Sequence, residues 1–243
     1  MAALSIEVLP DVEAVALRGA DLFALAAQEA AAARPAFTAA LSGGDSPGPL
    51  YALLARQQFT QKIPWRRVHL YWGDERCVPP DHADSNYRMT RESLLEPLGL
   101  TRVHRIEGER APEAAASDYE RALVGALGAP PVFDLVWLGM GPDGHTASLF
   151  PGSPAVAEKQ RYVVANPVDS PLTHGKATRI TLTLPAIDAA RRVRFLVAGA
   201  DKAARLHDVL DGPAGRFPAQ LVRGADVAWL VDAAAAAQLG ARP

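Results

Sequence analysis

Short apolar runs alternate along the chain with longer stretches that carry a helical pattern. The runs are mostly rich in Val, Ile, Leu and aromatic residues and end near glycine or proline, as strands do. Seven strands are expected: Phe37–Leu41, Val68–Trp72, Phe133–Leu138, Tyr162–Ala165, Arg179–Leu184, Val193–Ala198 and Val227–Val231. Helices are expected over 11–33, 47–58, 85–96, 112–127, 200–210 and 232–239, with N-caps at Asp11, Asp84 and Asp201.

This alternation of strands and helices favours an α/β fold with a largely parallel sheet covered on both faces. Segments rich in proline and glycine are only a few residues long, and neither a repeat nor a low-complexity tail is present. We therefore expect one domain over residues 1–243. In such sheets ligands bind beyond the carboxyl ends of the strands, so the loops that follow strands should carry the chemistry.

Composition narrows the function classes. The formal net charge is -2 and no long Lys/Arg block is present, which gives no sign of a nucleic-acid partner. The single cysteine, Cys77, excludes an intrachain disulfide framework and a cysteine-rich metal site. The N-terminus lacks the pattern of a secretion signal, and the alanine-rich stretches are too short to span a membrane. We expect a cytoplasmic protein without membrane partners.

The first loop of interest follows the strand FTAAL and runs from Ser42 to Pro47. The adjacent Gly43 and Gly44 let the backbone turn tightly and approach a ligand closely. Backbone N–H groups before a helix form a ready anion site, although a plain tight turn would use the same residues. The loop is not a Walker A motif, because the Gly-Lys-Ser/Thr ending is absent.

The second loop follows VHLYW and begins with Gly73, Asp74, Glu75 and Arg76. The two carboxylates could serve as acid/base or orienting groups, and the arginine could hold a phosphate with two hydrogen bonds. A solvated, salt-bridged turn is the alternative. The same loop also contains Asp81, His82 and Asp84. Their spacing fits no metal-site template, so a solvated loop without a metal is favoured at these three residues.

The third loop follows FDLVWL and runs from Gly139 to Ser148. It contains GxGxxG, but no acidic residue closes a second strand about 20 residues later, as dinucleotide binding requires. The glycines instead pack around His145 and place it near the start of a short helical turn. Histidine is suited to proton transfer near neutral pH, and Asp143 could fix its tautomer or the loop shape. A structural or exposed histidine is the alternative.

Together the three loops resemble the 6-phosphogluconolactonase branch of the glucosamine-6-phosphate deaminase/6-phosphogluconolactonase family. The resemblance extends from about Leu41 to about Leu210 and rests on SGGDSP, WGDERCVPPDHADSNYRM, FDLVWLGMGPDGHTASLFPGS and RITLTLP. It implies a three-layer αβα, modified Rossmann-like fold. Two departures are visible: Ser46 stands where the family usually has threonine, and PLTHGKATR, with His174 and Lys176, replaces the usual Pro-Lys-Pro-Pro.

The resemblance also implies residue roles. His145 and Asp143 are the expected catalytic residues. The expected substrate- and phosphate-binding residues are Ser42, Gly43, Gly44, Asp74, Arg76, Arg179 and Lys202. The implied reaction is hydrolysis of 6-phospho-D-glucono-1,5-lactone, the second step of the oxidative pentose phosphate pathway. Water attacks C1, His145 transfers the proton, and neither a metal nor an organic cofactor is called for. The implied partner is the phosphorylated sugar lactone, bound by a monomer or small homo-oligomer.

Three rival functions were weighed. An amino-sugar phosphate deaminase/isomerase has an acid soon after its histidine, as in GHIAFNEP, whereas here GHTASLFPGS has none before Glu158. A sugar-phosphate sensor normally carries a DNA-binding module, for which this chain has no room. A serine hydrolase would need a G-x-S-x-G elbow, and Ser42 has none. Hydrolysis of the lactone is therefore favoured.

Overall fold

The computed structural model describes residues 5–44, 46–173 and 175–240. A seven-stranded sheet with the strand order β1-β10-β9-β6-β2-β3-β5 lies at its centre, and every pairing in it is parallel. This confirms the expected α/β class. The strands are β1 (Ser5–Leu9), β10 (Val227–Asp232), β9 (Val193–Val197), β6 (Leu135–Leu138), β2 (Phe37–Leu41), β3 (Val68–Trp72) and β5 (Val103–His104). The edge strands β1 and β5 were not among those expected from the sequence.

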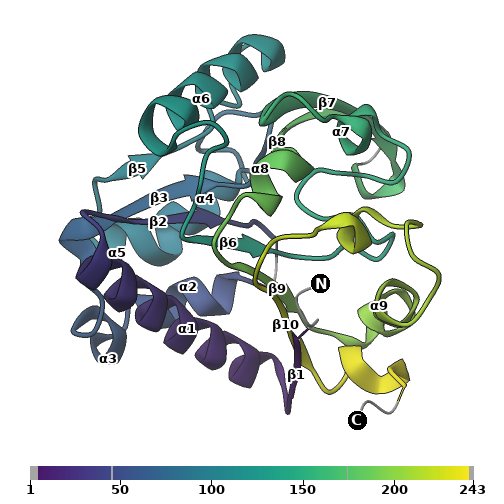
Figure 1. Cartoon of the computed structure of the whole chain (residues 1–243), viewed down its shortest axis with the longest axis horizontal. Coiled ribbons are helices and arrows are strands. Elements are labelled where there is room, and N and C mark those ends of the chain that lie inside the picture. The colour runs from purple at the N-terminus through teal and green to yellow at the C-terminus, as the bar shows by residue number, and fades with distance from the viewer. Residues whose placement is uncertain (1–4, 45, 174, 241–243) are drawn as a thin grey trace.

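Helices cover both faces of this sheet, with α1 and α2 on one side and α6 and α8 on the other (Figure 1). The helices are α1 (Val12–Ala33), α2 (Gly48–Leu54), α3 (Gln57–Thr60), α4 (Asn86–Thr90), α5 (Glu96–Leu98), α6 (Pro112–Leu127), α7 (Pro154–Ala157), α8 (Leu184–Asp188) and α9 (Ala203–Leu210). Shorter turns are η1 (Trp65–Arg67), η2 (Arg91–Leu95), η3 (Pro171–Thr173), η4 (Ala200–Lys202), η5 (Pro218–Leu221) and η6 (Ala235–Gln238). Within the described ranges no helix is long and apolar enough to cross a membrane.

A second, antiparallel sheet has the order β4-β8-β7 and comprises β4 (Asp74–Arg76), β8 (Gly175–Leu182) and β7 (Val163–Ser170). The expectation of a loop at Asp74–Arg76 is therefore wrong. The runs expected as strands at 162–165 and 179–184 belong to this sheet, and not to the parallel one. The physical reason is the short connection between β7 and β8, because neighbouring strands joined by a tight turn pair in antiparallel fashion.

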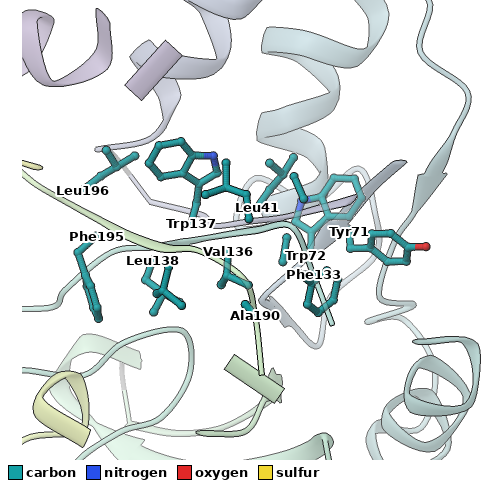
Figure 2. Packing of buried hydrophobic residues seen from close by; sticks show 14 of the residues in the cluster. Leu41, Tyr71, Trp72, Phe133, Val136, Trp137, Leu138, Ala190, Phe195 and Leu196 are labelled. Atoms are coloured by element: carbon teal, nitrogen blue, oxygen red, sulfur yellow. The ribbon is translucent and has the colours of Figure 1, made fainter. Parts of the chain in front are cut away.

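The core lies on both sides of the central strands. All residues of β2, β6 and β9 are buried, including the polar Thr38 in β2 and Arg194 in β9, and β6 is apolar throughout. Figure 2 shows Trp137 on one side of β6 and Val136 and Leu138 on the other. Because side chains alternate along a strand, the fully apolar run supplies both layers of helices with packing partners.

One of the three expected N-caps is confirmed. Asp11 accepts a hydrogen bond from the N–H of Ala14 and caps α1. The prediction for Asp84 is wrong by one residue, because the buried hydroxyl of Ser85 caps α4 and accepts from the N–H of Arg88. The prediction for Asp201 is wrong as well: its carboxylate pairs with the neighbouring lysine inside the 3₁₀ turn η4 and caps nothing.

Several expected helices are shorter or divided. The segment 47–58 breaks after α2, because Arg56 is extended, with ψ 150°, before α3 begins. The segment 85–96 continues through the π turn η2 into α5, since Pro97 lacks the N–H that an unbroken α-helix needs. The segment 200–210 opens as the 3₁₀ turn η4, and 232–239 keeps only the single turn η6. The short helices α7 and α8 were not expected.

Candidate active site

A cavity of about 310 Å³ lies where the loops after β2, β3, β6 and β9 meet the second sheet. This is the carboxyl edge of the parallel strands, where the sequence analysis placed the chemistry. Eight of the nine expected site residues line it: Ser42, Gly43, Gly44, Asp74, Arg76, His145, Arg179 and Lys202. The ninth, Asp143, stands directly behind His145.

His145 and Asp143 form a close pair. Oδ1 of Asp143 lies 2.5 Å from Nδ1 of His145 and also accepts the His145 backbone N–H at 3.1 Å. Burial raises the pKa of the Asp143 carboxyl, but the hydrogen bonds and charge of His145 outweigh it and hold this pKa below its ordinary value. An ionised carboxylate only accepts hydrogen bonds, so Nδ1 carries the hydrogen. Nε2 then keeps a lone pair and has no hydrogen-bond partner among the described residues.

The loop around this pair requires a glycine at one point of close approach. A Cβ at Gly141 would lie 2.1 Å from Cε1 of His145 and 2.9 Å from Oδ1 of Asp143. The expected glycine packing is therefore present. The expected helical turn at His145 is not, because an isolated bridge between Thr146 and Leu149 follows instead, with Ala147 between them at φ 46°.

Two arginines face the cavity side by side. Arg76 on β4 and Arg179 on β8 are paired directly in the antiparallel ladder. Among the described residues neither guanidinium has a carboxylate within ion-pair distance; Arg76 donates to the backbone carbonyl of Asp84. Burial, and then the charge of Arg76, lower the pKa of Arg179. Two like charges at a cavity wall, with no described carboxylate within ion-pair distance of either, favour an anionic ligand.

Lys202 reaches the cavity from η4, after β9. Its Nζ lies 2.5 Å from Oδ2 of Asp201, and this contact lowers the pKa of the Asp201 carboxyl. Lys202 is therefore paired, unlike the two arginines. Two further residues belong to the PLTHGKATR segment, which departs from the family pattern. Lys176 lies in β8 opposite Asp169, and His174 is outside the described residues.

A buried tyrosine holds the loop after β2 in place by two hydrogen bonds. The hydroxyl of Tyr51 accepts from the N–H of Ser42 at 3.0 Å and donates to its carbonyl at 2.8 Å. Burial raises the pKa of Tyr51, so its hydroxyl stays neutral and can perform both roles. The Oγ of Ser42 bonds only weakly to its neighbour, at 3.3 Å from the carbonyl of Gly43.

The sequence analysis missed a polar network beneath the cavity. Asp74 accepts from Oγ of Ser148 at 2.6 Å and from Nδ2 of Asn86 at 3.2 Å. Asn86 is 2% exposed, and a Cβ on Gly43 would lie 1.8 Å from its Oδ1. Both Asn86 and Ser148 line the cavity. The sequence indicates Asn86 only as a residue at the start of the helix expected over 85–96.

Glu75 proves to be an orienting group. Its buried carboxylate accepts from the N–H groups of Arg76, Asn86 and Tyr87 and from the hydroxyl of Ser85, at 2.8–3.0 Å. Burial raises the pKa of Glu75 in spite of these bonds. Because its oxygens are all engaged, it is not free to act as an acid or base in the cavity.

Phe150 stands where an acid would be needed for the deaminase alternative. Its ring stacks on His145 with the centroids 4.2 Å apart and the planes 19° from parallel. Glu158, the next acidic residue along the chain, accepts from the backbone N–H groups of residues 159–161 and does not line the cavity. Among the described residues no carboxylate contacts His145 except Asp143.

Comparison with known proteins shows the family to which the chain belongs. Residues 10–230 match the family described as glucosamine-6-phosphate isomerases/6-phosphogluconolactonase. The 6-phosphogluconolactonase of Nostoc sp. is 39% identical, with 97% of this chain and 98% of that protein covered. The protein of the same name from Mycobacterium tuberculosis is 40% identical, with the same coverage.

Solved structures agree as well. The 6-phosphogluconolactonase of Trypanosoma cruzi superposes with a TM-score of 0.87 at 30% identity, covering 99% of both chains. A monomeric glucosamine-6-phosphate deaminase shares the fold, with a TM-score of 0.83, 97% of this chain and 100% of that chain covered, at 21% identity. With a match over most of its length, the chain belongs to the glucosamine-6-phosphate isomerase/6-phosphogluconolactonase family.

Proposed function

We propose that this protein hydrolyses 6-phospho-D-glucono-1,5-lactone to 6-phosphogluconate, the second step of the oxidative pentose phosphate pathway. The observation that carries the proposal is one cavity lined by two different kinds of functional group. A histidine with an open Nε2 lines it, and so do two arginines without a described carboxylate partner. Relatives about 40% identical over nearly the whole chain bear the name of this enzyme, which supports the substrate.

His145 is the proposed general base. Asp143 keeps hydrogen on Nδ1, so Nε2 accepts a proton from water as the water oxygen attacks C1 of the lactone. The tetrahedral oxyanion then collapses and the bond between C1 and the ring oxygen breaks. The proton held on Nε2 passes to that oxygen, which leaves as a hydroxyl group. The histidine returns to its starting state, so one residue serves both proton transfers.

Arg76 and Arg179 are the proposed phosphate ligands, with Lys202 and the backbone of Ser42–Gly44 as further contacts. Burial, and then the charge of Arg76, lower the pKa of Arg179, and a phosphate between the two guanidinium groups would offset both effects. Binding the remote phosphate also orients the lactone, so that its affinity contributes to the alignment of C1 with water. A cytoplasmic location and a monomer or small homo-oligomer belong to the same proposal, tested by cell fractionation and light scattering.

The deciding experiment is hydrolysis of freshly generated 6-phosphogluconolactone, corrected for spontaneous hydrolysis. The wild type should accelerate it, and His145→Ala should lower kcat by about 100-fold or more while circular dichroism stays unchanged. Release of ammonia from glucosamine 6-phosphate would instead establish the deaminase. Tight binding of the sugar phosphate without turnover by the wild type would establish a sensor.

A further inference from the structure

The loop that carries Asp143 and His145 is held from behind by one arginine of α9. Nε of Arg205 donates to the carbonyl oxygen of Pro142 at 3.0 Å. Its Nη1 pairs with Oδ2 of Asp208 on the same helix at 3.0 Å, which fixes the guanidinium plane. Arg205 is not among the described residues that line the cavity, so it has no contact with a ligand there.

The same guanidinium also covers an aromatic ring that presses on the loop. Cζ of Arg205 lies 4.3 Å from the ring centroid of Phe217. This ring fills the space beside Gly144, where a Cβ would lie 2.7 Å from Cδ1 of Phe217. The N–H of Ala219 donates to the Gly144 carbonyl at 3.1 Å. The two carbonyls that flank Asp143 are therefore both fixed from outside the loop.

Arg205 also stands one turn after Lys202, which does line the cavity. The 3₁₀ turn η4 that ends at Lys202 runs directly into α9, so one continuous stretch of helical backbone connects the cavity cation to the back of the His145 loop. A displacement of this helix would move both ends of the site together.

We propose that Arg205 is a positioning residue that sets the Asp143–His145 geometry through the Pro142 carbonyl and the Phe217 ring. This inference rests on the proposed lactonase function for its kinetic readout, but its structural readout is independent. Arg205 acts by two properties that lysine lacks: an N–H at Nε, within the side chain, and a flat guanidinium group that stacks on a ring.

The test compares Arg205→Lys and Arg205→Met with wild type. Both should lower kcat by about 10- to 100-fold, because a small misplacement of a catalytic group has an effect of that order, while KM changes far less. Histidine ¹⁵N resonances should show one tautomer, protonated at Nδ1, in the wild type and a mixture in the variants. Arg216→Lys is the matched control: Cζ of Arg216 lies 5.6 Å from the same Phe217 ring, and its exposed side chain bonds to no described residue.

Two results would overturn the proposal. One is a kcat at the wild-type level in Arg205→Met. The other is a lowered kcat with an unchanged His145 tautomer in the conservative Arg205→Lys, which would indicate a merely structural role. Absence of lactone hydrolysis in the wild type itself would refute the proposed function, and the tautomer comparison would still decide the role of Arg205.

Discussion

Single residues around His145 leave its ring one reactive position. Asp143 occupies Nδ1, Phe150 covers one face, and the absent Cβ of Gly141 makes room for the edge. Only Nε2 has no partner among the described residues. These contacts hold the ring in one tautomer, as a general base in a fixed position requires.

Exchanging Asp143 for asparagine tests the carboxylate charge directly. Oδ1 of Asp143 accepts from both Nδ1–H and the backbone N–H of His145, so an amide oxygen can take its place, but the variant lacks the charge that stabilises the imidazolium formed when Nε2 takes up the water proton. We expect kcat to fall by about 10- to 100-fold with little change in KM, because a hydrogen bond to a charged group contributes about 1.5–3 kcal/mol. Because the pKa of Asp143 is below its ordinary value, the wild type should show no acid limb from this carboxyl near neutral pH. Asp118→Asn, on the exposed side of α6, is the control; equal kcat in both variants would contradict the role.

Gly141 offers a purely steric test of the same geometry. In Gly141→Ala the new Cβ would lie 2.1 Å from Cε1 of His145 and 2.9 Å from Oδ1 of Asp143, so the pair must shift from its present geometry. We expect a loss of kcat with secondary structure intact. Gly125→Ala in α6 is the matched control, because a Cβ there meets nothing within 4 Å and should stabilise the protein by about 0.5–1 kcal/mol. Wild-type kcat in Gly141→Ala would show that the ring tolerates displacement.

Among the elements, β4 and α4 are joined through one buried carboxylate. Glu75 accepts four hydrogen bonds from the segment that carries Arg76 and Asn86 into the cavity. In Glu75→Gln the amide NH₂ would face the N–H of Tyr87, leaving one buried donor unpaired at a cost of about 1–3 kcal/mol. Glu75→Ala leaves four donors unpaired and should cost more. Urea denaturation gives the order; an alanine variant as stable as the glutamine variant would contradict it.

The pairing of β3 with β5 contains two histidines that share one hydrogen bond. Nδ1 of His69 lies 3.1 Å from Nε2 of His104, and the ring planes are 6° from parallel with centroids 5.3 Å apart. The ring centroids are farther apart than the two nitrogens by about two ring radii. The bonded nitrogens therefore lie between the two centroids, and the rings meet edge to edge. One nitrogen must donate and the other must accept. A proton on the accepting nitrogen would break the bond.

Acidification should therefore weaken the protein through this pair. Burial lowers the pKa of both histidines; the charge of Arg102 adds to this for His69, and His69 adds to it for His104. Below the ordinary histidine pKa of about 6.5, the unfolded chain binds protons that the folded chain does not. The free energy of unfolding therefore decreases as the pH is lowered. His104→Gln should show a smaller fall between pH 7.5 and 5.5 in urea denaturation. Exposed His207→Gln is the control, and parallel curves for wild type and His104→Gln would refute the prediction.

For the whole molecule, the sequence predicted the parts governed by local pattern. The strands β2, β3 and β9 were placed to within a residue because short, mainly apolar runs between helical stretches are typical of strands in a parallel sheet. The expected site residues came together because parallel strands end at a common edge. The position of His145 followed from the loop motif and the family resemblance.

What the sequence left out depends on contacts between distant segments. β4 is three residues long and exists only because β8 pairs with it, about a hundred residues later. Asn86 and Ser148 joined the site through hydrogen bonds to Asp74 that no spacing indicates. The cap at Ser85 was missed because it depends on Glu75. Such features become visible only when the chain is folded.

The two sheets supply different groups to the proposed mechanism. The parallel sheet supplies the His145 loop, and the antiparallel sheet supplies Arg76 and Arg179 in register. Burial of Arg179, and then the charge of Arg76 beside it, lower the pKa of Arg179, so its charge opposes folding in the absence of ligand. A phosphate would reverse that effect, so substrate affinity and the stability of the empty protein should respond to Arg179 in opposite directions.

Arg179→Met tests this division of labour. KM for the phosphorylated lactone should rise about 10- to 100-fold, because a hydrogen bond to a charged group contributes about 1.5–3 kcal/mol, while kcat/KM for unphosphorylated gluconolactone stays unchanged. Without ligand the melting temperature should not fall, since a half-buried charge facing Arg76 has been removed. Inorganic phosphate should raise the melting temperature of the wild type more than that of the variant. Exposed Arg121→Met is the control. An equal loss with both lactones would mean that Arg179 does not contact the phosphate, and that β8 shapes the cavity without binding its ligand.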